Sequence, residues 1–156
     1  MTTQLIVPTE KSVGDILTSL YGKEVTTVAA DPLPAADSFV SSYLCDEDKT
    51  VAVCLADYAA VGNAGGSLLM LPVGGIEDAV NDKDISKNMS EGFYEVVNVL
   101  SRVLMDNNSL HLRLDKLYPP GEATAVTEEL GSDIEEMGFD ITVQGYATGR
   151  ISFQLA

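Results

Sequence analysis

Basic residues are scarce in this sequence. Nine lysines and arginines stand against 24 aspartates and glutamates, which leaves a formal charge of −15 at pH 7. Nucleic acids and anionic membrane surfaces bind proteins mainly through lysine and arginine, whose charges neutralise phosphate groups. The charge balance therefore argues against a nucleic-acid-binding protein and against a protein that binds an anionic membrane.

Long apolar runs are also absent. The most apolar stretch covers residues 58–72, is too short to span a bilayer as a helix, and is interrupted by Gly62, Gly65 and Gly66. Neither end of the sequence resembles a signal peptide. We therefore expect a soluble, cytoplasmic protein with no segment in a membrane.

Residues that commonly bind metals or carry redox chemistry are few. The two cysteines, Cys45 and Cys54, lack a Cys-x-x-Cys spacing, and His111 is the single histidine. The acidic residues 46–49 form a predicted hairpin turn, which would place Cys45 opposite residue 50 and away from Cys54. We therefore predict two free, buried cysteines that pack as small apolar groups, and no metal site.

The length of 156 residues is typical of one domain with a substantial core, so we treat residues 1–156 as a single domain. Apolar periodicity and turn residues predict the order of its elements. They are a helix at 10–21, strands at 24–30, 38–45 and 50–58, helices at 59–72, 76–81 and 84–106, a strand at 110–118, a helix at 126–138 and a hairpin at 140–156. The third strand is apolar at nearly every position, which is typical of a central strand covered on both faces. This order indicates an α+β fold with a mainly antiparallel sheet.

The glycine-rich segment GNAGG, at residues 62–66, does not match a phosphate-binding loop. It has neither the G-x-G-x-x-G spacing nor the G-x-x-x-x-G-K-[ST] motif, and no lysine follows that could bind a phosphate. We instead expect residues 59–72 to form a helix of small residues that packs closely on the sheet.

The helix predicted at 84–106 has an unusual polar face. Its apolar side chains recur at helical spacing and predict one buried face: Met89, Phe93, Val96, Val97, Leu100, Val103 and Leu104. About half a turn away, Glu91, Glu95, Asn98 and Arg102 line up on the predicted solvent face. Asparagine is a poor helix former, because its short amide competes for nearby backbone groups. The simplest interpretation is a solvated face. An asparagine in the middle of a helix is unfavourable, however, which indicates a functional role as the alternative.

A faint internal repeat relates this helix to the first one. The segment SVGDILTSLYG, at the first helix, aligns with EVVNVLSRVLM, so that Ser12 matches Glu95 and Asp15 matches Asn98. Each helix then leads into strands. The alignment predicts two helix-plus-strand halves that share one sheet, of which only the second carries the glutamate and the asparagine.

The pattern Glu-x-x-Asn on an exposed helix resembles the CheC, CheX and FliY phosphatases, and the resemblance extends over nearly the whole chain. Glu95 and Asn98 match the Glu and Asn of the family signature, and Pro119 or Pro120 matches the proline that follows roughly twenty residues later. The departure is Glu91, which stands where the family has Asp or Ser. The resemblance implies an α+β fold in which two long helices pack on one face of a mainly antiparallel sheet built from two pseudo-repeated halves.

Members of this family act in chemotaxis and two-component signalling. They remove phosphate from the aspartyl phosphate of CheY-like response-regulator receiver domains, which bind their own Mg²⁺. The resemblance implies that Asn98 holds the attacking water in line with the phosphorus, since an amide both accepts and donates hydrogen bonds. It implies that Glu95 pairs with a lysine of the receiver, that Glu91 assists this docking, and that the protein needs no cofactor of its own.

The first helix is not equipped in the same way. Ser12 and Asp15 replace the Glu and Asn there, and an aspartate would bring negative charge toward a phosphoryl group. One working site per chain follows, as in the CheX branch, whose members are dimers. We expect a homodimer for this reason and because an open antiparallel sheet leaves free edges.

Two alternatives remain open. One is a CheX-like protein that binds a receiver, or a flagellar or signalling partner, without catalysis; the departure at Glu91 and the strong negative charge both keep this alternative open. The other is an unrelated α+β protein in which Glu95 and Asn98 belong to a solvated helix face.

Overall fold

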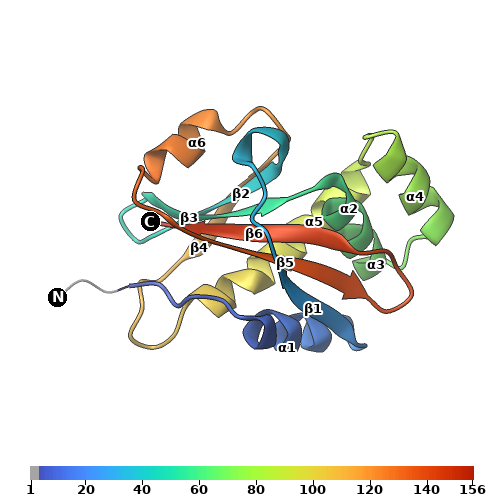
Figure 1. The fold of residues 1–156 in the computed structure, drawn as a ribbon, viewed down its shortest axis with the longest axis horizontal. Helices are drawn as coiled ribbons and strands as arrows, with labels where there is room; N and C mark the ends of the chain where they lie inside the picture. The colour runs from blue at the N-terminus through green and yellow to red at the C-terminus, as the bar shows by residue number, and fades with distance from the viewer. Residues whose placement is uncertain (1–3) are drawn as a thin grey trace.

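A six-stranded sheet forms the centre of the structure, a computed structural model that describes residues 4–156 (Figure 1). The strands lie in the order β1-β5-β6-β3-β2-β4, and every neighbouring pair is antiparallel. They are β1 (Val25–Ala30), β2 (Phe39–Leu44), β3 (Thr50–Ala56), β4 (Arg113–Tyr118), β5 (Glu135–Val143) and β6 (Gly149–Leu155). The predicted α+β fold with a mainly antiparallel sheet is confirmed.

The helices follow the predicted order along the chain. They are α1 (Glu10–Tyr21), η1 (Ala35–Asp37), α2 (Tyr58–Ala60), η2 (Val61–Gly65), α3 (Gly66–Leu68), α4 (Val73–Asn81), α5 (Lys87–Leu100), η3 (Ser101–Leu104) and α6 (Thr124–Glu129). Helices α2, η2 and α3 are continuous, and η2 is a π-helical segment, so residues 58–68 form the expected helix of small residues. Within residues 4–156, none of these helices is long and apolar enough to cross a membrane.

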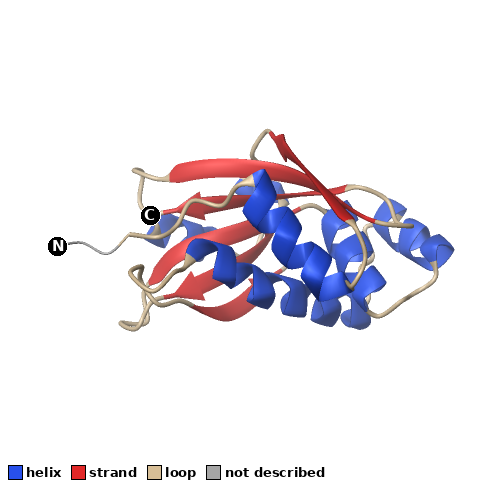
Figure 2. Cartoon of the chain, turned by 90° about the horizontal axis from the view of Figure 1, so that it is seen from below, coloured by secondary structure: helices blue, strands red, loops and turns tan. Residues whose placement is uncertain are grey.

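The two long helices, α1 and α5, cover one face of the sheet, as predicted (Figure 2). The main core lies between these helices and the sheet. Its large members include Val13 and Leu17 of α1, Phe93, Val96, Val97 and Leu100 of α5, and Tyr43, Ile141, Ile151 and Phe153 of the strands. On the opposite face, Val53 and Leu55 of β3 pack against Leu130 at the end of α6. Strand β3 is therefore covered on both faces, which explains its nearly continuous apolar sequence.

Several predicted helix bounds were wrong, and the helix of small residues predicted at 59–72 ends at Leu68. The helix predicted at 84–106 starts later, because Ser86 caps α5 through a hydrogen bond from the backbone N–H of Met89, and it ends earlier in the 3₁₀ turn η3. The helix predicted at 126–138 stops at Glu129, and Gly131, with φ +83°, turns the chain toward β5. Gly138 belongs to β5, where a Cβ would lie 2.7 Å from the backbone oxygen of Ala30.

The strand order confirms the two pseudo-repeated halves. The first half is α1-β1-β2-β3 and the second is α5-β4-β5-β6. If the two halves are exchanged, the order β1-β5-β6-β3-β2-β4 becomes the same order read in reverse. A pseudo-two-fold axis therefore runs between β6 and β3, and each half contributes its first strand to the outer edge of the other half.

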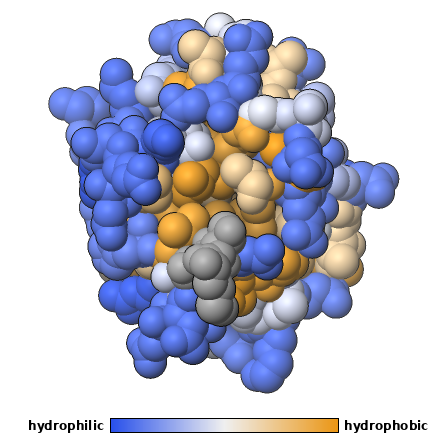
Figure 3. Space-filling view, turned by 90° about the vertical axis from the view of Figure 1, so that its left-hand side faces the viewer, coloured by the Kyte–Doolittle hydropathy of each residue, from blue (hydrophilic) through white to orange (hydrophobic). Residues whose placement is uncertain are grey.

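The end of the molecule that carries the C-terminus has an apolar hollow (Figure 3). Leu5, Val7, Val51, Leu110 and Leu155 contribute to its lining, and its volume is about 310 Å³. In Figure 1 this end lies opposite α4, so the hollow is remote from α3 and from the start of α5.

Candidate functional site

Helix α5 presents the predicted polar face to solvent. Val96, Val97, Leu100 and Leu104, which were predicted to be buried, are fully inaccessible. Glu91, Glu95, Asn98 and Arg102 are all exposed. The periodicity of the helix therefore places the two candidate catalytic residues, Glu95 and Asn98, side by side at the surface, with their Cβ atoms about 5–6 Å apart.

Two contacts fix α5 against the rest of the protein. Gly92 lies so close to η2 that a Cβ on it would be 2.3 Å from the backbone oxygen of Gly65. Near the other end, the hydroxyl of Tyr43 on β2 donates a hydrogen bond of 2.5 Å to the backbone oxygen of Val97. Burial raises the pKa of Tyr43 well above its ordinary value, so the phenol remains a donor. These contacts hold the backbone on either side of Glu95 and beside Asn98.

The side chains of Glu95 and Asn98 are available to a partner. Among residues 4–156, neither makes a hydrogen bond or an ion pair, so the Asn98 amide can donate and accept at the same time. Glu91 lies 3.8 Å from Lys87 one turn earlier, but both side chains are exposed, and such pairs contribute little to stability. Glu91 can exchange this lysine for a basic group of a partner.

A hollow of about 380 Å³ lies directly beside this polar face. Glu91, Tyr94 and Glu95 of α5 form one side of it, and Leu68 and Leu69 form the other. The predicted docking residues therefore border an apolar depression that the sequence did not indicate. The run LLMLP contributes to this depression. Its sequence suggests only the end of a buried helix, although part of it is exposed.

The matching face of α1 is occupied by contacts within the helix. The Ser12 hydroxyl accepts a hydrogen bond from the backbone N–H of Thr9, and the Thr9 hydroxyl accepts one from Ser12, which completes a capping box. Asp15 forms an ion pair of 2.7 Å with Lys11. In the first half of the repeat, both positions therefore serve the helix itself, in contrast to Glu95 and Asn98.

Pro119 and Pro120 immediately follow β4, at the place where the proline of the signature was expected. The backbone oxygen of Pro119 accepts a hydrogen bond from the backbone N–H of Glu122, which starts the turn toward α6. The predicted position of these prolines, directly after a strand, agrees with the structure because β4 ends at Tyr118.

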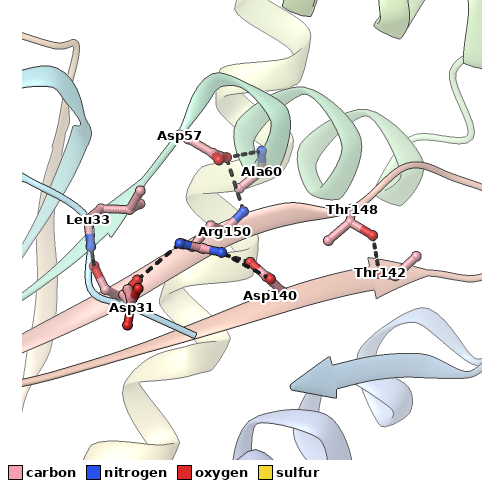
Figure 4. Close-up of polar contacts among 9 residues, drawn as sticks. Asp31, Leu33, Asp57, Ala60, Asp140, Thr142, Thr148 and Arg150 are labelled. Atoms are coloured by element: carbon pink, nitrogen blue, oxygen red, sulfur yellow. Dashed lines mark hydrogen bonds and ion pairs between the residues drawn. The ribbon is translucent and has the colours of Figure 1, made fainter. Parts of the chain in front are cut away.

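A second polar cluster lies on the sheet face opposite α1 and α5 (Figure 4). Arg150 of β6 binds both carboxylate oxygens of Asp140 on β5, at 2.7 and 3.2 Å, and its backbone N–H donates to Asp57. Asp57 also caps α2 by accepting from the backbone N–H of Ala60 at 2.8 Å. Burial raises the pKa of Asp57 above its ordinary value. This cluster was not predicted from the sequence, although an aspartate before a helix of small residues is a usual N-cap signal.

The cysteines are free and buried, as predicted. Over the part of the chain that the structure describes, His, Cys, Asp and Glu side chains form no group of three or more that could hold a metal ion. The exposed side chains on α5 can offer hydrogen bonds and negative charge to a partner.

No protein-family model matches the sequence, and no curated protein matches it. Solved structures do match. The first is the FliM–SpeE complex from H. pylori, with a TM-score of 0.64 at 6% identity over 94% of this chain and 80% of the matched chain. The FliM middle domain from H. pylori gives 0.56 at 8% identity over 94% and 84%, and the FliG–FliM complex gives 0.54 at 9% identity over 94% and 85%. The chain thus has the fold of the FliM middle domain, which agrees with the α+β fold expected from the sequence, and at such identities the likeness concerns the fold alone.

Proposed function

We propose that this protein is a phosphatase that acts on the aspartyl phosphate of a CheY-like receiver domain. The observation that carries the proposal is the exposed Asn98, whose side chain has no hydrogen-bond partner among residues 4–156 and which lies one turn from Glu95 on a helix with close contacts to β2 and η2. A mid-helix asparagine disfavours the helix relative to alanine, and its free amide suits a water-positioning role.

The chemistry follows from what an amide can do. When α5 is laid against the receiver, the Asn98 carbonyl oxygen accepts a hydrogen bond from a water, and its NH₂ group donates to that water or to a phosphoryl oxygen. Positioning is most of what this reaction requires, because the phosphoryl group transfers through a loose transition state. Glu95 pairs with a lysine of the receiver and sets the docking orientation, and Glu91 contributes further negative charge. The Mg²⁺ in this proposal belongs to the receiver.

A second candidate function is binding without catalysis. It is favoured by the structural neighbours, two of which are complexes of FliM with another protein, SpeE or FliG. In this alternative the same face of α5 binds a receiver or a flagellar or signalling partner, and Asn98 serves as a contact residue only.

Dephosphorylation of labelled receiver domains separates the two functions. We expect wild-type protein to accelerate phosphate loss, and Asn98→Ala to reduce the maximal rate by about 10²-fold with unchanged receiver binding. Because Asn98 is exposed and alanine is the better helix former, the variant should be as stable as wild type or up to about 0.7 kcal/mol more stable. Glu95→Ala should instead weaken receiver binding.

Asp15→Ala is the matched control, since Asp15 is the repeat-equivalent of Asn98 and is also exposed. It should leave the rate unchanged. If Asn98→Ala retains the full rate toward a receiver that wild type dephosphorylates, the water-positioning mechanism is wrong. If wild type binds receivers and accelerates none, the protein is a binding module.

A further inference from the structure

An apolar ridge runs from the end of α3 to the start of α4 and consists of the half-buried Leu68 and the exposed Leu69, Met70 and Val73. Leu69, Met70 and Val73 are 47, 81 and 45% exposed, and they are three of the six large apolar side chains that are exposed within residues 4–156. Contiguous apolar exposure of this kind marks interaction surfaces, whereas single exposed apolar residues are ordinary.

The backbone conformation of Met70 is unfavourable for a residue that has a Cβ. Met70 has φ +55°, in the left-handed region. The N–H of Met70 bonds the oxygen of Ser67, and the N–H of Leu71 bonds the oxygen of Gly66, which is the hydrogen-bond pattern of a Schellman helix end. Glycine is the usual residue at this position because it has no Cβ. A methionine here does not serve the turn, so its exposed and adaptable side chain needs another reason.

The ridge adjoins the candidate site on α5. Leu68 and Leu69 face Glu91, Tyr94 and Glu95 across the hollow of about 380 Å³. Glu95 lines this hollow, so a protein that docks on Glu95 to bring a phosphoryl group to Asn98, one turn further along α5, lies next to it. A specific interface also needs about 800 Å² from each partner, which a single line of helix side chains does not provide.

Charge identifies the kind of surface that fits. The carboxylates of Glu91 and Glu95 border an otherwise apolar depression, so an inserted apolar side chain must be accompanied by a basic one. The overall charge of −15 adds to this preference, because it disfavours any partner surface that is purely acidic.

We infer that the apolar ridge and this hollow are the part of the docking surface that selects the receiver. The receiver inserts a large apolar side chain between Leu69 and Tyr94 and places a lysine or arginine beside it, next to Glu91 and Glu95. Met70 and Val73 extend the apolar contact toward α4. This inference rests on the proposed function and adds the chemistry by which the chain distinguishes one receiver from another.

Steady-state dephosphorylation of the cognate receiver tests the inference through Leu69→Glu and Met70→Gly. Both variants should raise KM by about tenfold or more, the loss expected for an apolar side chain removed from an interface. The rate at saturating receiver should stay within about twofold of wild type, because Asn98 is untouched. Met70→Gly should also raise Tm by about 2–4 °C, since glycine suits the turn. A residue with a purely structural role would not weaken docking while the fold becomes more stable.

Val28→Glu is the matched control for Leu69→Glu. Val28 is 51% exposed on β1, and the substitution changes the net charge by the same amount. It should leave KM unchanged. The inference is overturned, and the proposed function stands, if Leu69→Glu and Met70→Gly keep the wild-type KM or if Val28→Glu raises KM equally. If wild type binds the receiver without dephosphorylating it, the same comparison is made with dissociation constants. If it does not bind the receiver, both proposals are wrong.

Discussion

The contact between Gly92 and Gly65 gives a quantitative test of how α5 is held. A Cβ added at Gly92 would lie 2.3 Å from the backbone oxygen of Gly65 and 3.2 Å from its Cα. Ordinary contact for such a Cβ begins at 3.4 Å. Both partners are backbone, so no side-chain rotation relieves the clash, and in Gly92→Ala α5 must move away from η2 by about 1 Å.

The expected magnitude follows from two opposing effects. Overpacking a buried contact costs about 1–3 kcal/mol, or more where the backbone itself must move, and alanine returns about 0.8–1 kcal/mol through its better helix propensity. We expect a net loss of about 2 kcal/mol in the free energy of unfolding, which corresponds to a Tm lower by about 4–8 °C. The displacement of α5 should also lower the dephosphorylation rate, because Asn98 moves with the helix.

Urea unfolding followed by circular dichroism measures this change, since the sequence contains no tryptophan for fluorescence. Gly75→Ala in α4 is the matched control, because a Cβ there meets nothing within 4 Å. The control should be stabilised by about 0.5 kcal/mol through helix propensity and reduced freedom of the unfolded chain. If Gly92→Ala shifts stability in the same direction as Gly75→Ala, the close contact between α5 and η2 does not exist as described.

Two further predictions concern pH and assembly. Because burial raises the pKa of Asp57 above 3.8 in the folded state, its contribution to stability is complete below pH 3.8 and is lost as pH rises through the folded pKa. Asparagine is also a good N-cap, so Asp57→Asn should gain stability relative to wild type as pH rises from 3 to 7 in urea titrations. A difference in stability that does not change with pH would contradict the raised pKa of Asp57. The chain should also form a dimer at micromolar concentration through the edge of β4. The other edge strand, β1, is shielded by hydrogen bonds from the backbone N–H of Val25 to Thr18 and from that of Ala29 to Glu10. Sedimentation that shows monomer alone would exclude the dimer.

Local patterns accounted for the elements that carry the site. The apolar spacing of α1 and α5 predicted which faces are buried, and the exposure of Asn98 followed because it lies half a turn from Val96 and Leu100. The stop of α1 at Gly22, with φ +70°, was likewise readable from the sequence. These features depend on residues within a few turns of one another, so a short window of sequence contains their physical causes.

Segment 131–138 shows where local pattern fails. Ile134 and Met137 fit a helical spacing, yet Met137 lies in β5, which pairs with β6 at Met137–Phe153 and with β1 from Gly138, opposite Ala30, onward. A short apolar run fits either period, and the partner strand, which is distant in sequence, determines the outcome.

The faint repeat between the α1 and α5 segments already indicated two halves with unequal polar faces. It could not show that β1 and β4 exchange halves at the sheet edges, because strand order reflects the sum of many long-range contacts. The surroundings of Glu95 and Asn98 have the same origin: the Tyr43–Val97 hydrogen bond, the Gly65–Gly92 contact and the ridge at Leu69 all join segments far apart in the chain. The identity and exposure of the candidate residues are thus local properties of one helix, whereas the contacts that position that helix and the surface beside it arise only when the distant segments pack together.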